Sequence, residues 1–264
     1  MAEEEVREMV YEAGGVDADI SELIQEGIEA FSKDIGPYIL AGMGQFLVVV
    51  PVTIFTVLAA YLGSFLGMMG GWVLGLVVAV ILASLGDVGA FLGALVMVFL
   101  PFIGMFAVLL PIIPISVAIL APVNASLTRA VAAHQRGEKE LHIGSAFETI
   151  TQDLLRVIPT ALALTALGLV GLLFCYVGAL VVPILFGFVG TLVALHRCGP
   201  LEAFRLQITH LRKHGNAHLV IGVAQIAFSM VAGFVPVIGP MFLIDMQVRA
   251  HRKMFGDDAT PVVT

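Results

Sequence analysis

Charged side chains are the residue class that this sequence has least of. Only 12% of its 264 residues are Asp, Glu, Lys or Arg, against about 25% in an average soluble domain. None of these four residue types occurs in three long segments, 35–86, 88–128 and 157–195, or in a shorter fourth segment, 219–244. The mean hydropathy is +1.02. A chain of this length could not hide so much apolar surface from water, so the composition excludes an ordinary soluble protein.

The charge-free segments also lack the alternation of polar and apolar residues that a transmembrane β-strand requires. Backbone groups in hydrocarbon must be paired internally, which leaves helices as the alternative. A spanning helix needs about 20 apolar residues, so each of the first three segments has room for two crossings. We therefore predict an all-α, polytopic transmembrane bundle built from repeated hairpins. Eight spans are expected, at 38–61, 66–85, 89–107, 109–128, 157–174, 177–195, 216–233 and 235–252; six remain if the glycine-rich stretch 63–93 is re-entrant.

Basic residues are absent from the interior of every charge-free segment, and all 13 lie in the intervening polar stretches. If each segment is a hairpin, all of them fall on one side of the membrane. The positive-inside rule then predicts a cell (inner) membrane protein with both termini in the cytoplasm. The acidic start lacks the layout of a secretory signal peptide, so no cleavage is expected. The two cysteines, Cys175 outside and Cys198 inside, should not form a disulfide.

Three polar stretches have apolar residues at helical spacing, 20–31, 143–156 and 200–214. Each precedes a predicted pair of spans, and we interpret each as an amphipathic helix in the inner interface. Phe31, Phe147 and Phe204 occupy matching positions and are expected to insert into lipid. The basic residues expected to meet lipid headgroups are Arg156, Arg205, Arg212 and Lys213. Ala-Phe pairs at these three places, with Ala90-Phe91 near the middle of the longest gap, suggest four repeats of about 57–60 residues.

The sequence divides into four parts on this interpretation. Residues 1–34 form an acidic arm, with 11 acids against two basic residues, and include the first amphipathic helix. Residues 35–128 form the first membrane half, with two hairpins. Residues 129–256 form the second half, with two repeats of an amphipathic helix and a hairpin, and 257–264 are a C-terminal tail. The arm is a solvated end, or it contacts a basic partner or the basic stretches of a neighbouring subunit.

Two stretches carry a resemblance to a known group. They are Gly199-Pro-Leu-Glu-Ala-Phe-Arg through Lys213-His-Gly-Asn216, and Gln247-Val-Arg-Ala-His-Arg-Lys-Met-Phe-Gly256. They resemble poorly characterised prokaryotic multi-pass membrane proteins, which are similar to the membrane domain of some glycerophosphodiester phosphodiesterases. The resemblance covers about 143–256 well and the first half loosely. It implies a fold and a location but no reaction, because no soluble phosphodiesterase domain is present.

Catalytic motifs are missing as well: the sequence contains no nucleophile elbow, Walker or zincin pattern. His210, His214 and His218 are spaced by four, but Gly215-Asn216 should break a helix between the last two. A role near lipid headgroups is therefore favoured over a metal site. We predict no enzymatic activity, no cofactor, no metal and no nucleic-acid partner.

Two acids stand out from the apolar regions, Asp87 and Asp245. Asp87 is expected to be an interfacial loop residue or a helix cap. Asp245 lies inside the last predicted span, and Arg249 is four residues away on the same helix face. An ion pair is favoured there over a proton or cation site, although intramembrane carboxylates are functional candidates.

Small residues spaced by four are frequent and permit close approach of helices. They should pack within the chain or, alternatively, between subunits: Gly63, Gly67, Gly71, Gly75, Gly89 and Gly93. Intramembrane polar residues are too sparse for a hydrophilic path within one subunit. We therefore predict a non-enzymatic membrane protein that interacts with lipids or organises the membrane and forms a homo-oligomer. The alternative is a channel or transporter for a small or lipidic substrate, with a pore between subunits as one form.

Overall fold

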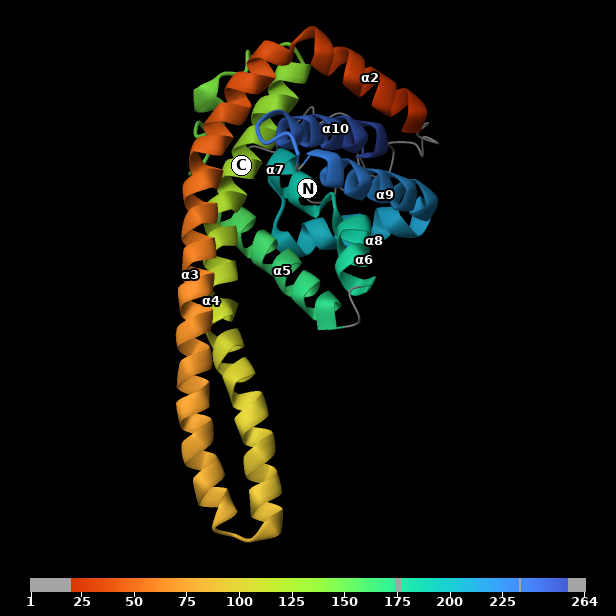
Figure 1. The fold of residues 1–264 in the computed structure, drawn as a ribbon. Coiled ribbons are helices and arrows are strands. Elements are labelled where there is room, and N and C mark those ends of the chain that lie inside the picture. The colour runs from red at the N-terminus through yellow and green to blue at the C-terminus, as the bar shows by residue number, and fades with distance from the viewer. Residues whose placement is uncertain (1–19, 174–176, 233, 256–264) are drawn as a thin grey trace. The chain divides into compact units, whose positions relative to one another are not determined.

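The computed structural model describes residues 20–173, 177–232 and 234–255, and this part of the chain is helical without β-strands (Figure 1). The predicted all-α class is confirmed. The elements are α2 (Ile20–Lys33), α3 (Ile35–Ala83), α4 (Asp87–Gln135), the 3-10 turn η1 (Ile143–Ala146), α5 (Leu154–Leu173), α6 (Val177–Phe186), α7 (Val189–His196), α8 (Pro200–Lys213), α9 (Gly215–Ala232) and α10 (Ile238–Phe255). Residues 1–19, Cys175 and the tail 257–264 lie outside the described residues, so the predictions made for them are not addressed.

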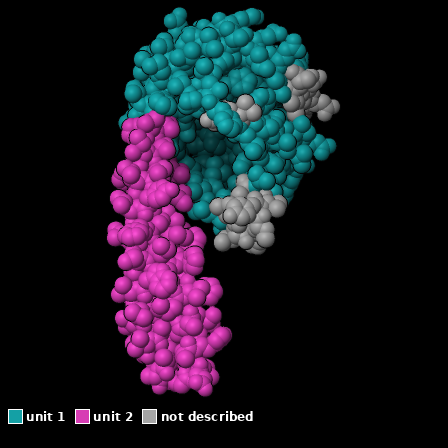
Figure 2. All heavy atoms as spheres, viewed as in Figure 1, with its two compact units in different colours: residues 1–48, 120–264 teal, residues 49–119 magenta. Residues whose placement is uncertain are grey.

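The chain divides into two compact units (Figure 2). Unit 1 comprises residues 1–48 and 120–264, and unit 2 comprises residues 49–119. Unit 2 consists of the C-terminal part of α3, a tight turn and the N-terminal part of α4. At the turn the Leu85 amide donates to the Leu82 carbonyl at 2.9 Å, and Gly86 has a φ of +89°, a conformation that favours glycine. Asp87 is exposed in the first turn of α4, as the interpretation as a loop residue or cap expected.

The glycines of unit 2 hold its two helix segments close together. A Cβ atom at Gly67 would overlap the Gly104 carbonyl oxygen, and one at Gly71 would overlap the Leu100 carbonyl oxygen. Gly63 faces Val108 in the same way. The remaining predicted packing glycines are Gly75, at ordinary contact distance from Met97, Gly89, against Leu82, and Gly93, against Ala79. The glycine pattern therefore packs within the chain, which is the first of the two interpretations given above.

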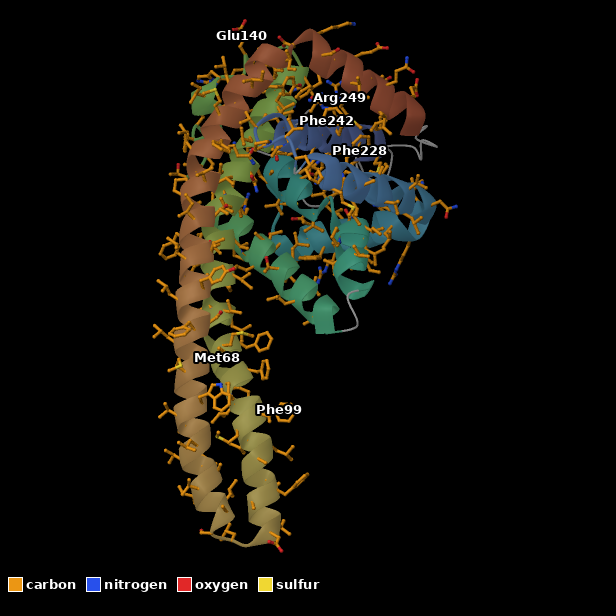
Figure 3. The ribbon with its side chains drawn as sticks, in the orientation of Figure 1. Met68, Phe99, Glu140, Phe228, Phe242 and Arg249 are labelled. Carbon is orange, nitrogen blue, oxygen red and sulfur yellow. The ribbon has the colours of Figure 1, made fainter. Side chains whose placement is uncertain are left out.

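Two of the three predicted turns between the first four spans were wrong, those at 62–65 and at 108, whereas the turn expected between 85 and 89 is present. Both α3 and α4 run on as continuous helices of 49 residues, through 62–65 and through 108, and the chain reverses at Ser84–Gly86. The stretch around 108 is apolar, and at 62–65 the Gly63-Ser64 pair does not interrupt the apolar run, so helical hydrogen bonding continues through both. Pro51 is accommodated inside α3. Met68 and Phe99 point outward from this helix pair and are 39% and 58% exposed (Figure 3).

In unit 1, α10 lies between α2 and α9 (Figure 1). Its buried residues include Met241, Asp245, Val248 and His251. Helix α5 packs along α6 and α7, and α7 packs against α8. Two clusters of buried apolar side chains result, one around Leu192 on α7 and one around Leu127 on α4. Unlike unit 2, this unit encloses both apolar and polar side chains.

Two of the three predicted amphipathic segments are helices, α2 and α8. At the start of α8 Pro200 takes the first helical position, and Glu202 accepts a hydrogen bond from the Gly199 amide at 3.3 Å. The segment 143–156 was predicted wrongly, because it forms η1 and further turns until α5 begins at Leu154. An α-helix there would pair the Thr149 amide with the Ser145 carbonyl. Both groups bond the Ser126 hydroxyl instead, at 3.2 and 2.9 Å.

Three helices of the described residues are long and apolar enough to cross a membrane: α3, α4 and residues Leu154–Gly171 of α5. Shorter apolar stretches cover Leu180–His196 and Gly215–Met230. The expected single span at 177–195 is interrupted, since α6 ends at Phe186 and α7 begins at Val189. The last expected span corresponds to α10, whose C-terminal half is polar. These helices are compatible with a membrane protein.

Candidate functional site

A cavity of about 290 Å3 lies within unit 1, where the C-terminal end of α4, the segment 137–152 and the end of α7 meet. Four basic side chains and one carboxylate line it, among the residues that the structure describes. The basic residues are Arg129, Arg136, Lys139 and Arg197, and the carboxylate is Glu148. We call this space the basic cavity. Its lining carries an excess of positive charge and therefore favours an anion.

Arg129 is the fixed wall of the basic cavity, with only 12% of its side chain exposed. Its Nε donates to the Ala194 carbonyl at 2.7 Å, and one terminal nitrogen donates to Thr149 at 3.3 Å. The other terminal nitrogen pairs with Asp153 at 3.2 Å. These bonds tie α4, the segment before α5 and α7 together. The guanidinium of Arg129 is thus bonded to protein groups, and its charge is partly offset by Asp153.

The other three cations are more exposed and have partners that are exchangeable. Arg136 pairs with Glu138 at 2.6 Å, and Lys139 pairs with Glu148. Arg197 donates to the Gln152 side-chain oxygen at 3.1 Å. The three side chains are 32%, 49% and 42% exposed. Exposed ion pairs contribute about 0–1 kcal/mol each, so an incoming anion can replace their carboxylates at little cost.

The charges around the opening of the basic cavity agree with this arrangement of exchangeable ion pairs. The hydrogen bond from Arg136 lowers the pKa of the exposed Glu138 carboxyl. Glu138 therefore stays ionised in the physiological range and can turn into water when Arg136 takes another partner. Asp153 is held more firmly, since Arg156 and Arg197 also approach it at 3.4 and 3.6 Å.

The floor of the basic cavity is built by Ser126, which is 1% exposed. Its hydroxyl accepts from the Thr149 amide and donates to the Ser145 carbonyl, so the segment 143–149 is held against α4. Gly44 on α3 brings a second helix to this segment, because any Cβ there would overlap the Ile143 carbonyl oxygen. The turn conformation that replaces the expected amphipathic helix is what shapes the cavity.

Asp245 is fully buried and is the centre of a polar network in unit 1. The predicted pair with Arg249 is present, with Nε–Oδ2 at 2.7 Å and a second nitrogen at 3.3 Å from Oδ1. Tyr38 donates to the same carboxylate at 2.5 Å, and Gln135 donates at 2.7 Å. Arg252 donates to the Gln135 oxygen at 3.0 Å. We call these five residues the Asp245 network; every partner supports its charge, as a structural role requires.

Histidines surround Phe255 near the end of α10, in an arrangement that the spacing pattern did not predict. His210 and His218 lie 2.8 Å apart between Nδ1 and Nε2, and His196 and His251 lie 3.0 Å apart between their Nε2 atoms. His210, His218 and His251 are buried, so the expected role near headgroups is wrong for these three. Burial lowers the pKa of His210 to about 4, with the neighbouring His214 as a smaller cause. Within the described ranges no set of three or more His, Cys, Asp or Glu side chains is placed to hold a metal ion.

The predicted lipid-facing residues do not lie in one kind of place. Phe31 was assigned wrongly: it is 6% exposed and packs against Tyr38 and Phe242, with ring centroids 4.5 and 5.4 Å away. Phe204 is half-buried against Phe186. Phe147 is 39% exposed and is the one of the three whose side chain is exposed in this structure. The apolar faces of α2 and α8 pack against other helices of unit 1, which explains why Phe31 is buried and Phe204 is half-buried.

The predicted basic residues lie outside the basic cavity. Arg205, Arg212 and Lys213 are exposed on α8, and Arg156 is exposed at the start of α5, where it donates to the Arg197 carbonyl. Sequence reasoning missed the cavity cations. Arg129 and Arg136 are seven residues apart and so share a helix face, which was the available signal. Nothing in the sequence indicated that α7 would bring Arg197 to the same place.

A second cavity, of about 190 Å3, lies between α4, α5, α7 and α10 in unit 1. Its polar lining residues are Asn124, Thr128, Thr160, Thr191 and Gln247. Asn124 accepts a hydrogen bond from Gln45 at 2.9 Å, and Gln247 donates to the Gly187 carbonyl at 2.7 Å. The polar groups of this cavity are thus partly used in holding helices together.

Comparison of the chain with protein-family models, with curated proteins and with solved structures returns no match. The resemblance drawn from 199–216 and 247–256 therefore stays a prediction. Function has to be argued from the chain's own geometry.

Proposed function

We propose that this chain is a non-enzymatic integral membrane protein that binds anionic lipid at its cytoplasmic surface and organises the bilayer around it. The observation that carries the proposal is where the charge-free runs end. The run 88–128 is followed directly by Arg129, and the run 157–195 ends two residues before Arg197. Both arginines line the basic cavity. Residues directly after a hydrocarbon-spanning run lie at headgroup depth, so the cavity would face lipid phosphates.

The orientation belongs to the same proposal. Continuous helices α3 and α4 cross in opposite directions, so the basic residues that precede and follow them come to one side. The positive-inside rule makes that side the cytoplasm, with both termini there, in the cell membrane. The continuous helices favour two crossings in 35–128 rather than four. The polytopic bundle and the repeated hairpins of the second half remain part of the proposal.

The length of the apolar helices supports a role in organising the bilayer. A 49-residue helix extends about 74 Å at 1.5 Å per residue, while the hydrocarbon core is about 30 Å thick. Large apolar side chains are exposed along this length, from Leu47 to Ile81 on α3. A helix longer than the bilayer must tilt or thicken the lipid around it. Local change of bilayer thickness is therefore the expected physical effect of this protein.

Two observations support the absence of enzymatic activity. Burial raises the pKa of the Cys198 thiol to about 12, so this cysteine stays protonated and is a poor nucleophile. The buried carboxylate, Asp245, is bonded by Tyr38, Gln135 and Arg249 and has little capacity left for a substrate. No cofactor, metal or nucleic acid is part of the proposal; the partners are lipids and further copies of the chain.

The test is the composition of the lipids that the protein retains. Protein purified in a mild neutral detergent should carry phospholipids enriched in anionic species relative to the bulk membrane extract, measured by native mass spectrometry and lipid analysis. The same measurement gives the oligomeric state, which we expect to exceed one copy. Retained lipids with the composition of the bulk extract would contradict anionic-lipid binding.

The second candidate function is a channel or transporter for a small or lipidic substrate, and the 190 Å3 cavity with its polar lining favours it. Thr160 and Thr191 are buried and line that cavity. If the cavity is a substrate site, Thr191→Val should reduce flux into protein-containing vesicles by about tenfold, since a lost hydrogen bond to a substrate costs about 1 kcal/mol or more. Vesicles that show no flux above protein-free controls would remove this candidate.

A further inference from the structure

We infer that the basic cavity is a discrete site for one phosphate-monoester headgroup, of the kind that a phosphatidate carries. This inference rests on the proposed lipid-binding function and narrows it from an anionic surface to a single ligand class. Cavity size, placement of the cations and charge each support it.

The size of the basic cavity limits how large a ligand it can hold. At about 290 Å3 it lies at the small end of ligand cavities, which run from about 300 to 1,000 Å3. It can hold a phosphate and a glycerol unit but not the acyl chains of a lipid. Those chains would have to remain outside, along the apolar residues that precede Arg129 on α4. A headgroup larger by an added sugar or a second glycerol phosphate would fill the space less well.

The placement of the cations in the basic cavity favours a compact anion. Arg136 and Lys139 lie in the segment directly after α4, and Arg197 lies just past α7, so two separate segments present donors to one space. Arg129 does not need to bind the ligand, since its nitrogens bond Ala194, Thr149 and Asp153. It fixes the wall against which the other three are arranged. Converging donors from separate segments recognise a compact anion better than a flat charged surface does.

The charge of the basic cavity determines which anions it favours. When an anion enters, Arg136 and Lys139 give up exposed ion pairs with Glu138 and Glu148, and Arg197 gives up Gln152 while it stays 3.6 Å from Asp153. Coulomb attraction to the three cations scales with ligand charge, so a phosphate monoester carrying close to two charges is favoured over a diester carrying one. The released carboxylates return to water, where they need no partner. A dianion therefore compensates the three cations more fully than a monoanion does.

The experiment uses the full chain, purified and delipidated in neutral detergent, and measures binding by titration calorimetry. The probes are dioctanoyl phosphatidate, dioctanoyl phosphatidylglycerol, glycerol 3-phosphate and inorganic phosphate. We expect saturable binding of one phosphatidate per chain, at least about tenfold tighter than phosphatidylglycerol, because a second ligand charge adds at least one charge-assisted contact. Equal affinity for the two lipids would overturn the inference while leaving general anionic-lipid binding intact. Binding of neither lipid would overturn the proposed function as well.

The soluble probes separate a lipid from a free phosphate ester. We expect glycerol 3-phosphate and inorganic phosphate to bind more weakly than phosphatidate, because the acyl chains hold the headgroup at the depth of the cavity. If glycerol 3-phosphate binds as tightly as phosphatidate, the lipid source is wrong and the site is one for a soluble phosphate ester.

Variants locate the site. Arg136→Gln with Arg197→Gln removes two mouth cations and should weaken phosphatidate binding by about tenfold or more. The matched control is Arg205→Gln with Arg212→Gln, which removes two exposed cations from α8, outside the cavity, and should change binding by less than about twofold. Arg136 and Arg197 are exposed enough for the variant to fold, and thermal unfolding of both variants checks this. An equal loss in the control would show that binding is a property of the whole basic surface and would overturn the discrete site.

Discussion

Unit 2 and unit 1 are stabilised by different kinds of contact. In unit 2, backbone meets backbone at Gly67 and Gly104, and the rest of the surface is large and apolar. Thr56 and Ser116 add a hydroxyl pair at 2.6 Å. In unit 1, helices enclose the Asp245 network and the paired histidines as well as apolar clusters. In the proposed membrane arrangement, lipid offers no hydrophobic driving force between helices, so close packing by small residues would hold unit 2 together. Unit 1 adds buried polar bonds to its apolar clusters and to close approaches such as that of Gly44 to Ile143.

The largest expected loss of stability comes from removing the ion pair of the Asp245 network in unit 1. Arg249→Gln leaves the carboxylate of Asp245, which is fully buried, without its cation. The free energy of unfolding should fall by about 3–5 kcal/mol, the usual cost of an unpaired buried charge. Thermal or denaturant unfolding in detergent measures this.

The control for that prediction is the double change Asp245→Asn with Arg249→Gln. An Asn oxygen can still accept from Tyr38 and Gln135, so most of the lost stability should return. If the double variant is as stable as the original chain but has lost lipid binding or transport, the carboxylate has a working role beyond structure.

The second effect concerns unit 2 and is smaller. Gly67→Ala places a methyl group against the Gly104 carbonyl and should cost about 1–3 kcal/mol, as overpacking does. Gly70→Ala is the matched control, because nothing lies within 4 Å of a Cβ there. It should be neutral or stabilise by up to about 1 kcal/mol through helix propensity. Fluorescence of Trp72, the single tryptophan and a unit 2 residue, follows unfolding of this region. Equal losses in the two variants would mean that the glycines do not mediate close packing.

The third expected effect is that the stability of unit 1 depends on pH more strongly than the stability of unit 2 does. The pKa of His210 is lowered by burial to about 4 in the folded protein, against about 6.5 when unfolded. Between these values the unfolded chain binds a proton that the folded chain does not, so stability present above pH 6.5 is lost as the pH falls toward 4. The loss for this residue reaches at most about 3 kcal/mol when the pH falls to about 4. His210→Gln should flatten the pH dependence of unit 1 unfolding.

Unit 2 provides the comparison for the pH prediction. Its residues 49–119 contain no histidine and one acid, Asp87, so Trp72 fluorescence should change little over the same pH range. The slope of unit 1 should persist in part in the variant, since His218 and His251 are buried too. An unchanged slope in His210→Gln would show that His210 is not the group that titrates.

The sequence predicted most of what depends on local pattern. Charge-free runs located the apolar helices, the spacing of four between Asp245 and Arg249 predicted their pair, and the glycine spacing predicted close packing. These features are read from residues that are neighbours on one helix. Periodicity also identified α2 and α8 as amphipathic helices, although it could not say that their apolar faces would pack on protein rather than lipid.

The failures arise where a distant residue decides the local structure. Ser126, on another helix, takes the hydrogen bonds that would have made 143–156 helical. Phe31 is buried by Tyr38 and Phe242, and Phe242 is more than 200 residues away in sequence. The basic cavity requires Arg197 to reach Arg129 across the fold. No single-sequence pattern reports such pairings, and the turn expected near Ser64 failed because length alone cannot place a break in an apolar run.

The smallest perturbation gives the sharpest test of how unit 2 lies in the membrane. Single cysteines replace Ser64 and Ser84 in a chain whose own two cysteines are changed to serine, and a membrane-impermeant maleimide is added to intact cells. In this structure Ser64 is within α3, while Ser84 is exposed at the turn. If α3 crosses once, the cysteine at Ser84 is labelled from outside and the one at Ser64 is shielded by lipid. If the chain turned at 62–65, as the sequence predicted, the result would be reversed, because the second span would return 84 to the cytoplasm. A cysteine at Gly137, beside the basic cavity, should be protected in either case by the positive-inside rule. Labelling at Gly137 would overturn the orientation on which the lipid proposal depends.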